Sequence, residues 1–256
     1  MSSPTLADTR ISCPYPGLRP FRSHEAPLFF GRGAQVEELL ARLESRRFLA
    51  VVGSSGCGKS SLVRAGLIPA LQEGFLSGAQ GPWRIARMRP GNAPFAQLAR
   101  ALLAEEALEP ERASLPGAMG LLQATLRRGP GGLLEALTEC GVGSRDPVLL
   151  LVDQFEEIFR YRRESDPNEA DAFVNLLLAS ARPGPVPLYV VLTMRSDFIG
   201  DCALFLDLPE AINDGQFLVP RLSREQYRAA IVEPARLVGR DLAPALVNRL
   251  LNDLRG

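Results

Sequence analysis

The 256-residue sequence predicts an α/β fold in which a parallel β-sheet carries helices on both faces. Two observations lead to this prediction. The runs Phe48–Val52 and Val148–Val152 contain only apolar residues, as strands buried on both faces do. Apolar residues between such runs recur at helical spacing, and strands that alternate with helices form parallel sheets. Any ligand of this sheet is therefore expected at the carboxyl ends of its strands.

The remaining elements follow from the same two periodicities. Further strands are expected over three ranges: Trp83–Met88, Pro187–Leu192 and Gln216–Val219. Helices are expected over six: Val36–Leu43, 58–71, much of 94–139, Ala172–Leu178, 223–237 and Pro244–Leu254. Ser223 and Gln226 form a capping box at the start of the fifth helix, and Pro234 predicts that this helix kinks or ends early.

The turn after the first strand matches the phosphate-binding P-loop pattern G-x-x-x-x-G-K-[ST] in full. Lys59, in this turn, is the only lysine, and the other 28 of the 29 basic residues are arginine. A compact ammonium suits a site for β- and γ-phosphates, and a planar guanidinium does not replace it. Because a strand precedes the turn and a helix follows it, the sequence predicts a nucleotide site here.

Each part of this turn has an expected role. The glycines let backbone amides wrap the β-phosphate at the positive end of the following helix. Lys59 would bridge the β- and γ-phosphates, Ser60 would ligate Mg²⁺, and Ser61 would reach the α-phosphate. The residues expected to form the phosphate site are Gly53, Ser54, Ser55, Gly56, Cys57, Gly58, Lys59, Ser60 and Ser61.

Acidic residues follow the second apolar strand. Asp153 ends that strand, where a P-loop protein places a magnesium-binding carboxylate; as an alternative, an Asp at this point caps a helix. Many P-loop ATPases have a water-activating glutamate directly after this Asp, but here that position is Gln154. Glu156 and Glu157 come next, and either can act as the base or complement the dipole of a first helical turn.

Arg195 follows the strand Pro187–Leu192. If this strand lies between the strands that carry the P-loop and Asp153, Arg195 would face the γ-phosphate. It would then distinguish a triphosphate from a diphosphate by charge. The alternative is an ordinary ion pair with Asp197 or Asp201.

Composition excludes several classes of protein. The net charge is zero, which argues against a general nucleic-acid surface. The four cysteines are dispersed without a C-x-x-C pair, and His24 is the single histidine, so neither a disulfide framework nor a zinc site is indicated. No run approaches the roughly 18 apolar residues of a membrane span, and the first residues do not resemble a signal peptide. We expect a cytoplasmic protein.

Taken together, these residues resemble the STAND NTPases, signalling relatives of the AAA+ ATPases, and above all the bacterial novel STAND group. Members of that group are usually joined to WD-repeat propellers or other sensor and effector modules. The segments that carry the resemblance are Pro16–Phe21, Phe29–Arg32, the P-loop, Arg89–Gly91, Leu150–Glu157, Leu192–Arg195 and Val219–Pro220.

The resemblance implies a sheet of ASCE type in the order 2-3-4-1-5 that binds ATP or ADP with Mg²⁺. It also implies that Phe30, Gly31 and Arg32 border the adenine and ribose, and that Arg195 reads the γ-phosphate. The family motif usually continues with glutamate, whereas this chain has Gly33.

The same resemblance suggests a division of the chain. We expect an N-terminal arm over 1–28, a nucleotide-binding core over 29–222, and the beginning of a helical lid over 223–256. In the family a further helical module and a winged helix follow, so the sequence reads as a truncated protein or a fragment.

The function implied is a slowly hydrolysing switch whose nucleotide state controls conformation and self-association, with unidentified sensor or effector partners. Two alternatives stay open: an ATPase that cycles continuously to do mechanical work, and a scaffold that binds ATP without turnover, which Gln154 favours. A GTPase is disfavoured, because the Asn-Lys-x-Asp motif that reads guanine needs a lysine outside the P-loop.

Overall fold

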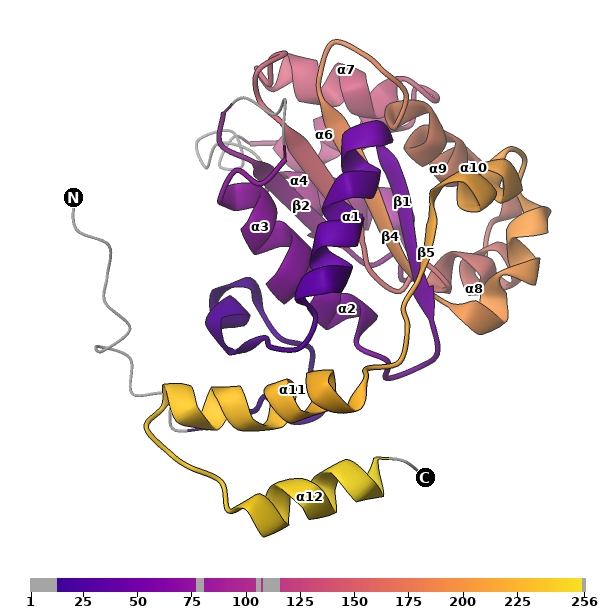
Figure 1. The fold of residues 1–256 in the computed structure, drawn as a ribbon. Helices are drawn as coiled ribbons and strands as arrows, with labels where there is room; N and C mark the ends of the chain where they lie inside the picture. Colours follow the sequence, from indigo (N-terminus) through magenta and orange to yellow (C-terminus); the bar gives the residue numbers. More distant parts are fainter. Residues whose placement is uncertain (1–12, 77–80, 105–106, 108–115, 255–256) are drawn as a thin grey trace. The chain divides into compact units, whose positions relative to one another are not determined.

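The computed structural model describes residues 13–76, 81–104, 107 and 116–254 (Figure 1). Within these residues, five parallel strands form a sheet in the order β2-β3-β4-β1-β5, which confirms the expected fold and strand order. The strands are β1 (Phe48–Gly53), β2 (Arg84–Met88), β3 (Val148–Val152), β4 (Leu188–Arg195) and β5 (Gln216–Leu218). β4 extends three residues past its expected end and includes Arg195.

Helices connect the strands. Their bounds are α1 (Gly33–Ser45), α2 (Lys59–Ser61), α3 (Ile68–Gln72), α4 (Pro94–Leu102), α6 (Ala118–Leu126), α7 (Gly132–Glu139), α8 (Glu157–Glu164), α9 (Pro167–Ser180), α10 (Leu208–Gly215), α11 (Arg224–Leu237) and α12 (Pro244–Asp253). The 3₁₀- and π-helical segments are η2 (Ser23–Leu28), η3 (Leu62–Leu67), η4 (Ser196–Phe198) and η5 (Gly200–Leu204). The π-helical η3 joins α2 to α3, so the helix after the P-loop is continuous along the chain.

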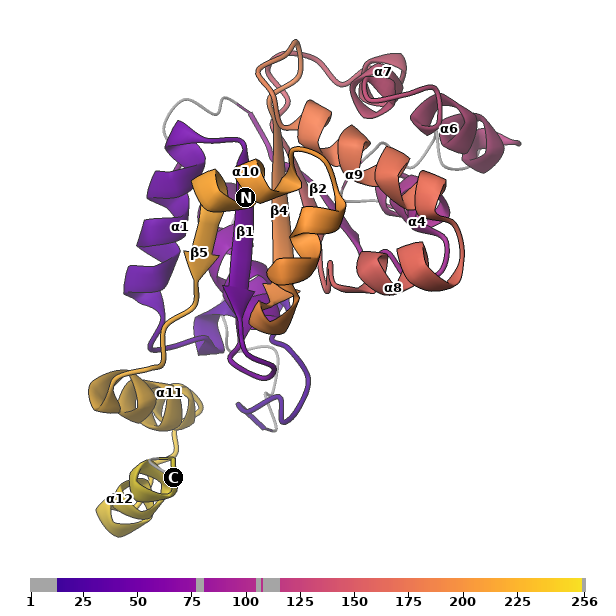
Figure 2. The ribbon, with the colours of Figure 1, turned by 90° about the vertical axis from the view of Figure 1, so that its right-hand side faces the viewer.

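Both faces of the sheet are buried, as the uninterrupted apolar strands require. Alternate residues such as Val52, Val152 and Leu192 share one apolar core with α4 and α6 to α10. Figure 2 shows α4, α6, α7, α8 and α9 grouped away from α1. The intervening residues, Val51 and Leu151 among them, are equally buried on the other face. Polar groups at the strand ends are therefore held on a rigid support.

The chain divides into two compact units. The sheet unit contains Glu37–Lys59 and Ala70–Pro220, and the second unit contains the described residues of Met1–Val36, Ser60–Pro69 and Arg221–Gly256. In the second unit, Val232 of α11 packs with two apolar residues of α12. The capping box at Ser223 is confirmed, and α11 continues three residues beyond Pro234.

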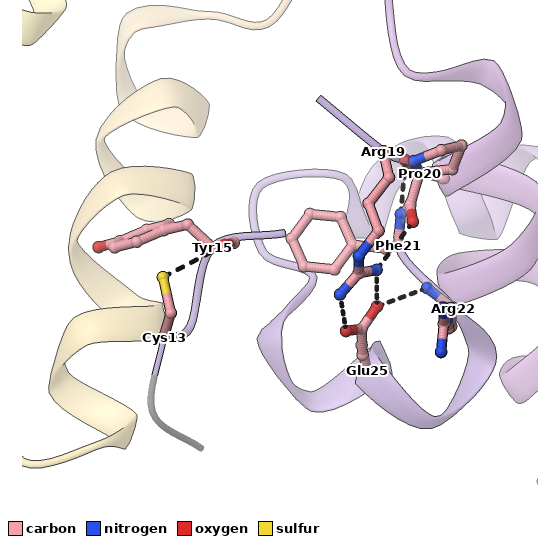
Figure 3. Close-up of polar contacts among 8 residues, drawn as sticks. Cys13, Tyr15, Arg19, Pro20, Phe21, Arg22 and Glu25 are labelled. Atoms are coloured by element: carbon pink, nitrogen blue, oxygen red, sulfur yellow. Dashed lines mark hydrogen bonds and ion pairs between the residues drawn. The ribbon is translucent and has the colours of Figure 1, made fainter. Parts of the chain in front are cut away.

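The N-terminal segment of the second unit is fixed by specific contacts (Figure 3). The Tyr15 hydroxyl donates to the Ile231 carbonyl of α11 at 2.5 Å. Arg19 donates to both carboxylate oxygens of Glu25, which also accepts from the Arg22 amide. This arrangement holds the pKa of the Glu25 carboxyl at about 2, chiefly through the hydrogen bonds from Arg19.

None of the helices in the described ranges combines the length and the apolar character that crossing a membrane requires.

Candidate nucleotide-binding site

The P-loop turn has the backbone that a phosphate cradle needs. Gly56 and Gly58 have φ angles of 74° and 95°, in the left-handed region that glycine enters without strain. A Cβ on Gly53 would come within 2.7 Å of the Cys57 sulfur, so a larger residue at this position would force the sulfur to move. Ser54, Ser55 and Gly56 are exposed, which leaves the amides of the turn accessible to an anion.

Lys59 is the first residue of α2, and its side chain extends back across this turn. Its ammonium donates to the carbonyl oxygens of Gly53 at 2.9 Å and Ser54 at 2.8 Å. The same ammonium lies 4.0 Å from the Cys57 sulfur. The charge is therefore directed at the cradle, where phosphate oxygens would replace the carbonyl acceptors.

Asp153 is held at the end of β3 by Thr193, the neighbouring residue on β4. The Thr193 hydroxyl donates to Asp153 Oδ1 at 2.6 Å and accepts from the Gln154 amide at 3.0 Å. Both Asp153 and Thr193 are about 1% exposed. The hydroxyl thus fixes the rotamer of the carboxylate that we expect to bind the metal.

The two glutamates have different surroundings. Glu157 Oε2 accepts from the Gly91 amide at 2.8 Å, so this carboxylate anchors the loop after β2. Glu156 is partly buried, and its Oε2 is a buried oxygen without a hydrogen-bond partner among the described residues. A buried carboxylate oxygen that accepts nothing is costly for the fold, and a catalytic role is one physical reason for keeping it. Of the two, Glu156 is the better candidate for a base.

Gln154, between Asp153 and these glutamates, has a left-handed backbone with φ of 57°. A non-glycine residue in this region stores strain, of the order of 1–3 kcal/mol, and such residues concentrate at functional sites. The Gln154 carbonyl accepts from the Glu157 amide at 3.0 Å, which starts the turn into α8. The sequence does not signal this conformation.

Arg195 ends β4, which does lie between β1 and β3, as its expected role requires. Its guanidinium forms an ion pair with Asp197 and lies 5.6 Å from the centroid of the Phe198 ring. Arg195 lowers the pKa of the Asp197 carboxyl through this hydrogen bond. Asp201, the other carboxylate considered from the sequence, has its Oδ1 4.0 Å from Arg163 Nη1. The ion pair is the alternative anticipated from sequence, and contact of Arg195 with a γ-phosphate stays a prediction.

The other predicted site residues lie in the second unit. Ser61 Oγ accepts from the Phe21 amide at 3.1 Å. Gly31 has φ of 84°, and a Cβ there would lie 2.4 Å from the Gln226 carbonyl oxygen, so α11 approaches this glycine closely. The flanking residues differ in exposure, since Arg32 is buried and Phe30 half-buried. The roles of Ser60, Ser61 and Phe30–Arg32 toward a nucleotide stay predictions.

The donor set suits magnesium. Mg²⁺ takes oxygen ligands and usually pairs one or two carboxylates with phosphate oxygens and water, and Asp153 and Ser60 are a carboxylate and a hydroxyl. Across the described ranges, no three His, Cys, Asp or Glu side chains gather as a ready-made metal cluster.

One cavity of about 460 Å³ lies at the opposite end of β1, beside Arg46, Arg47 and Phe48. Three acidic residues of the α10 region line it too, and Arg46 lies 3.4 Å from one of them, Asp214. Charges of both signs thus already face one another there. The cavity is separate from the P-loop and is not part of the candidate site.

Two residues beside Asp153 are not predicted individually from the sequence, although both lie in segments that carry the family resemblance. For Thr193, a threonine in an otherwise apolar strand next to that of Asp153 is a usable signal. Arg89 has its Nη2 3.8 Å from Asp153 Oδ2. Its place follows from the strand order, because β2 and β3 are neighbours.

A P-loop at the end of β1, with the strand that carries Asp153 one position beyond β4, defines a P-loop NTPase. The family comparison agrees, because the family described as Novel STAND NTPase 1 matches residues 14–256. The chain belongs to this family. The resemblance identified from sequence is thereby confirmed.

Solved structures show the same fold. The Walker-type ATPase of Pyrococcus abyssi is 17% identical with a TM-score of 0.56, and the match covers 92% of this chain and 65% of that one. The ORC2 protein of Aeropyrum pernix, in ADPNP–ADP complexes, is 15% identical with a TM-score of 0.52, and the match covers 80% of this chain and 52% of that one. This chain thus spans between half and two thirds of these proteins. No curated protein sequence matches it significantly.

Proposed function

We propose that the chain binds Mg-ATP, hydrolyses it slowly, and uses the nucleotide state as a switch for conformation and self-association. The observation that carries the proposal is the Lys59 ammonium directed into a glycine-lined turn, in a sheet where β4 alone separates the P-loop strand from that of Asp153. Lys59 would bind the β- and γ-phosphates, and Asp153 and Ser60 would hold Mg²⁺. Bound Mg²⁺ would neutralise charge that develops on the phosphates.

Glu156 is the base in this proposal. Its buried, unpartnered oxygen would accept a hydrogen bond from the attacking water, whereas Glu157 is already engaged by the Gly91 amide. Because Gln154 replaces the acid directly after Asp153, the base reaches the water from a different backbone position than in many P-loop ATPases. This supports slow hydrolysis.

Switching requires contacts that differ between the ATP and ADP states. Arg195 would leave Asp197 for the γ-phosphate, and the helices from Ser223 onward would form the lid over a core of residues 29–222. Residues 1–28 would form an N-terminal arm. Sensor or effector partners and ATP-dependent self-association belong to the proposal through family membership. A cytoplasmic location is proposed from the sequence alone.

The single lysine gives a direct test of nucleotide binding. A lysine-reactive acyl probe has two amine targets, Lys59 and the N-terminal amine, and the second serves as an internal control. We expect Mg-ATP and Mg-ADP to protect Lys59 while the N-terminal amine stays labelled, and Mg-GTP to protect less. If Lys59 is labelled equally with and without each nucleotide, the chain does not form a working site.

Paired glutamine variants test the base. Glu156→Gln should reduce ATP hydrolysis by about 10²–10⁴-fold while Lys59 remains protected. Glu157→Gln retains an oxygen that accepts from Gly91, so its rate should stay within about threefold of wild type. Equal rates for Glu156→Gln and wild type would remove the base role. Nucleotide protection without any hydrolysis in the wild type would favour the non-catalytic scaffold.

A further inference from the structure

The loop after β2 places an arginine against the expected metal-binding carboxylate. Met88 pairs with Val152 across the neighbouring strands, and the Asp153 amide donates to the Met88 carbonyl at 2.8 Å. Arg89 and Asp153, the residues that directly follow β2 and β3, are therefore neighbours. Arg89 Nη2 lies 3.8 Å from Asp153 Oδ2.

The two oxygens of Asp153 have different neighbours. Oδ1 accepts from the Thr193 hydroxyl, and Oδ2 faces the Arg89 guanidinium. The Asp153 side chain is 1% exposed, whereas that of Arg89 is 49% exposed. A buried carboxylate needs a nearby positive charge, and a half-exposed arginine can supply one and still swing into solvent.

The backbone of this loop is anchored on the far side of Arg89. Gly91 has φ of 56°, and its amide donates to Glu157 Oε2 at 2.8 Å. Glu157 begins α8, which follows directly from the turn after Asp153. The side chain of Arg89 thus extends from a segment fixed by β2 before it and by Glu157 after it. The proximity of Arg89 to Asp153 is a consequence of this fixed backbone.

We propose that Arg89 competes with Mg²⁺ for Asp153 and thereby sets the metal affinity of the nucleotide site. The inference rests on the proposed function, since it takes Asp153 as a metal ligand. Two cations at one carboxylate repel each other, so the Arg89 guanidinium would swing toward solvent when Asp153 holds a metal ion. Arg89 is a positioning residue in this scheme: it neutralises Asp153 until the metal arrives and makes no contact with the phosphates.

The test is the dependence of nucleotide binding on free Mg²⁺. Anisotropy of a fluorescent ADP analogue is titrated in EDTA and at increasing Mg²⁺, and the free Mg²⁺ at half-saturation is compared between variants. Arg89→Gln should lower this concentration by about two- to fivefold, which corresponds to the interaction energy of one charge pair partly screened by solvent. Arg100→Gln removes an arginine on α4 that donates to Gln97, and should leave it unchanged. Arg89→Lys keeps the charge and should retain most of the wild-type value.

A second readout follows the metal itself. With ADP bound, the electron paramagnetic resonance signal of free Mn²⁺ reports metal occupancy directly, and Arg89→Gln should bind Mn²⁺ more tightly by the same factor. Affinity for ADP in EDTA should not change. An unchanged or higher metal requirement in Arg89→Gln would overturn the proposal. A wild-type protein that binds no nucleotide in the first titration would instead overturn the proposed function, and with it the inference.

Discussion

Replacing Thr193 with valine should destabilise the protein and disorder the expected metal ligand together. The substitution keeps the shape of the side chain and removes a hydroxyl that makes two hydrogen bonds, to Asp153 Oδ1 at 2.6 Å and from the Gln154 amide at 3.0 Å. A hydrogen bond to a charged acceptor contributes about 1.5–3 kcal/mol, and a buried amide left unsatisfied costs about 1–3 kcal/mol. Since the valine methyl recovers up to about 1 kcal/mol by burial, we expect a net loss of about 3 kcal/mol.

The assay is urea unfolding of wild type, Thr193→Val and Thr193→Ser. If the unfolding free energy falls by about 3 kcal/mol per M of urea, a loss of about 3 kcal/mol in stability lowers the urea concentration at the unfolding midpoint by about 1 M. Thr193→Ser keeps the hydroxyl and loses one methyl, so it should cost only about 1 kcal/mol. Thr193→Val should also need more Mg²⁺ to support binding of the fluorescent ADP analogue, because Asp153 is no longer oriented. If Thr193→Val is as stable as Thr193→Ser, the hydroxyl does not hold Asp153, and this account of the site is wrong.

Three further predictions use the same measurements. Glu157→Ala removes the acceptor of the loop amide after β2 and should lower the unfolding free energy by about 1.5 kcal/mol; Glu157→Gln, which retains an acceptor, should lose less. Gly53→Ala should lower the unfolding free energy by about 1–3 kcal/mol, because the new methyl group overpacks against the Cys57 sulfur. The double variant Gly53→Ala/Cys57→Ala should recover most of this stability. If it does not, the clash lies elsewhere. The pKa of the Glu25 carboxyl is lowered from 4.5 to about 2, so its pair with Arg19 contributes its full stabilisation above pH 4.5. The difference in unfolding free energy between wild type and Glu25→Gln should therefore shrink as the pH falls toward 2. A difference that is independent of pH would contradict the pairing.

The sequence was sufficient for the sheet but only partly for the site. Continuous apolar runs are unambiguous for strands buried on both faces, so β1 and β3 were found at their observed starts. β4 was ended too early, because Thr193 and Arg195 break the apolar run although the backbone stays extended. Contacts such as Gly91 to Glu157 join residues far apart in sequence, and no periodicity reports them. The strand order implied by the family resemblance places β2 beside β3, but it does not specify which side chains meet beyond the strand ends, so the contact of Arg89 with Asp153 comes only from the structure.

The left-handed turn at Gln154 offers a physical reason for the shifted glutamate. In this turn the Gln154 amide is used to bond Thr193, and the next amide, of Phe155, donates to the Thr193 carbonyl at 2.9 Å. Both bonds fasten the segment after Asp153 to β4 and bury the Phe155 ring in the core. The first acidic side chain beyond this double attachment is Glu156, at the start of α8. Because both bonds are made by backbone amides, the chain can keep Asp153 fixed with glutamine at position 154. In the proposed mechanism, the carboxylate near the reacting phosphate would then be that of Glu156, the residue whose buried oxygen lacks a hydrogen-bond partner among the described residues.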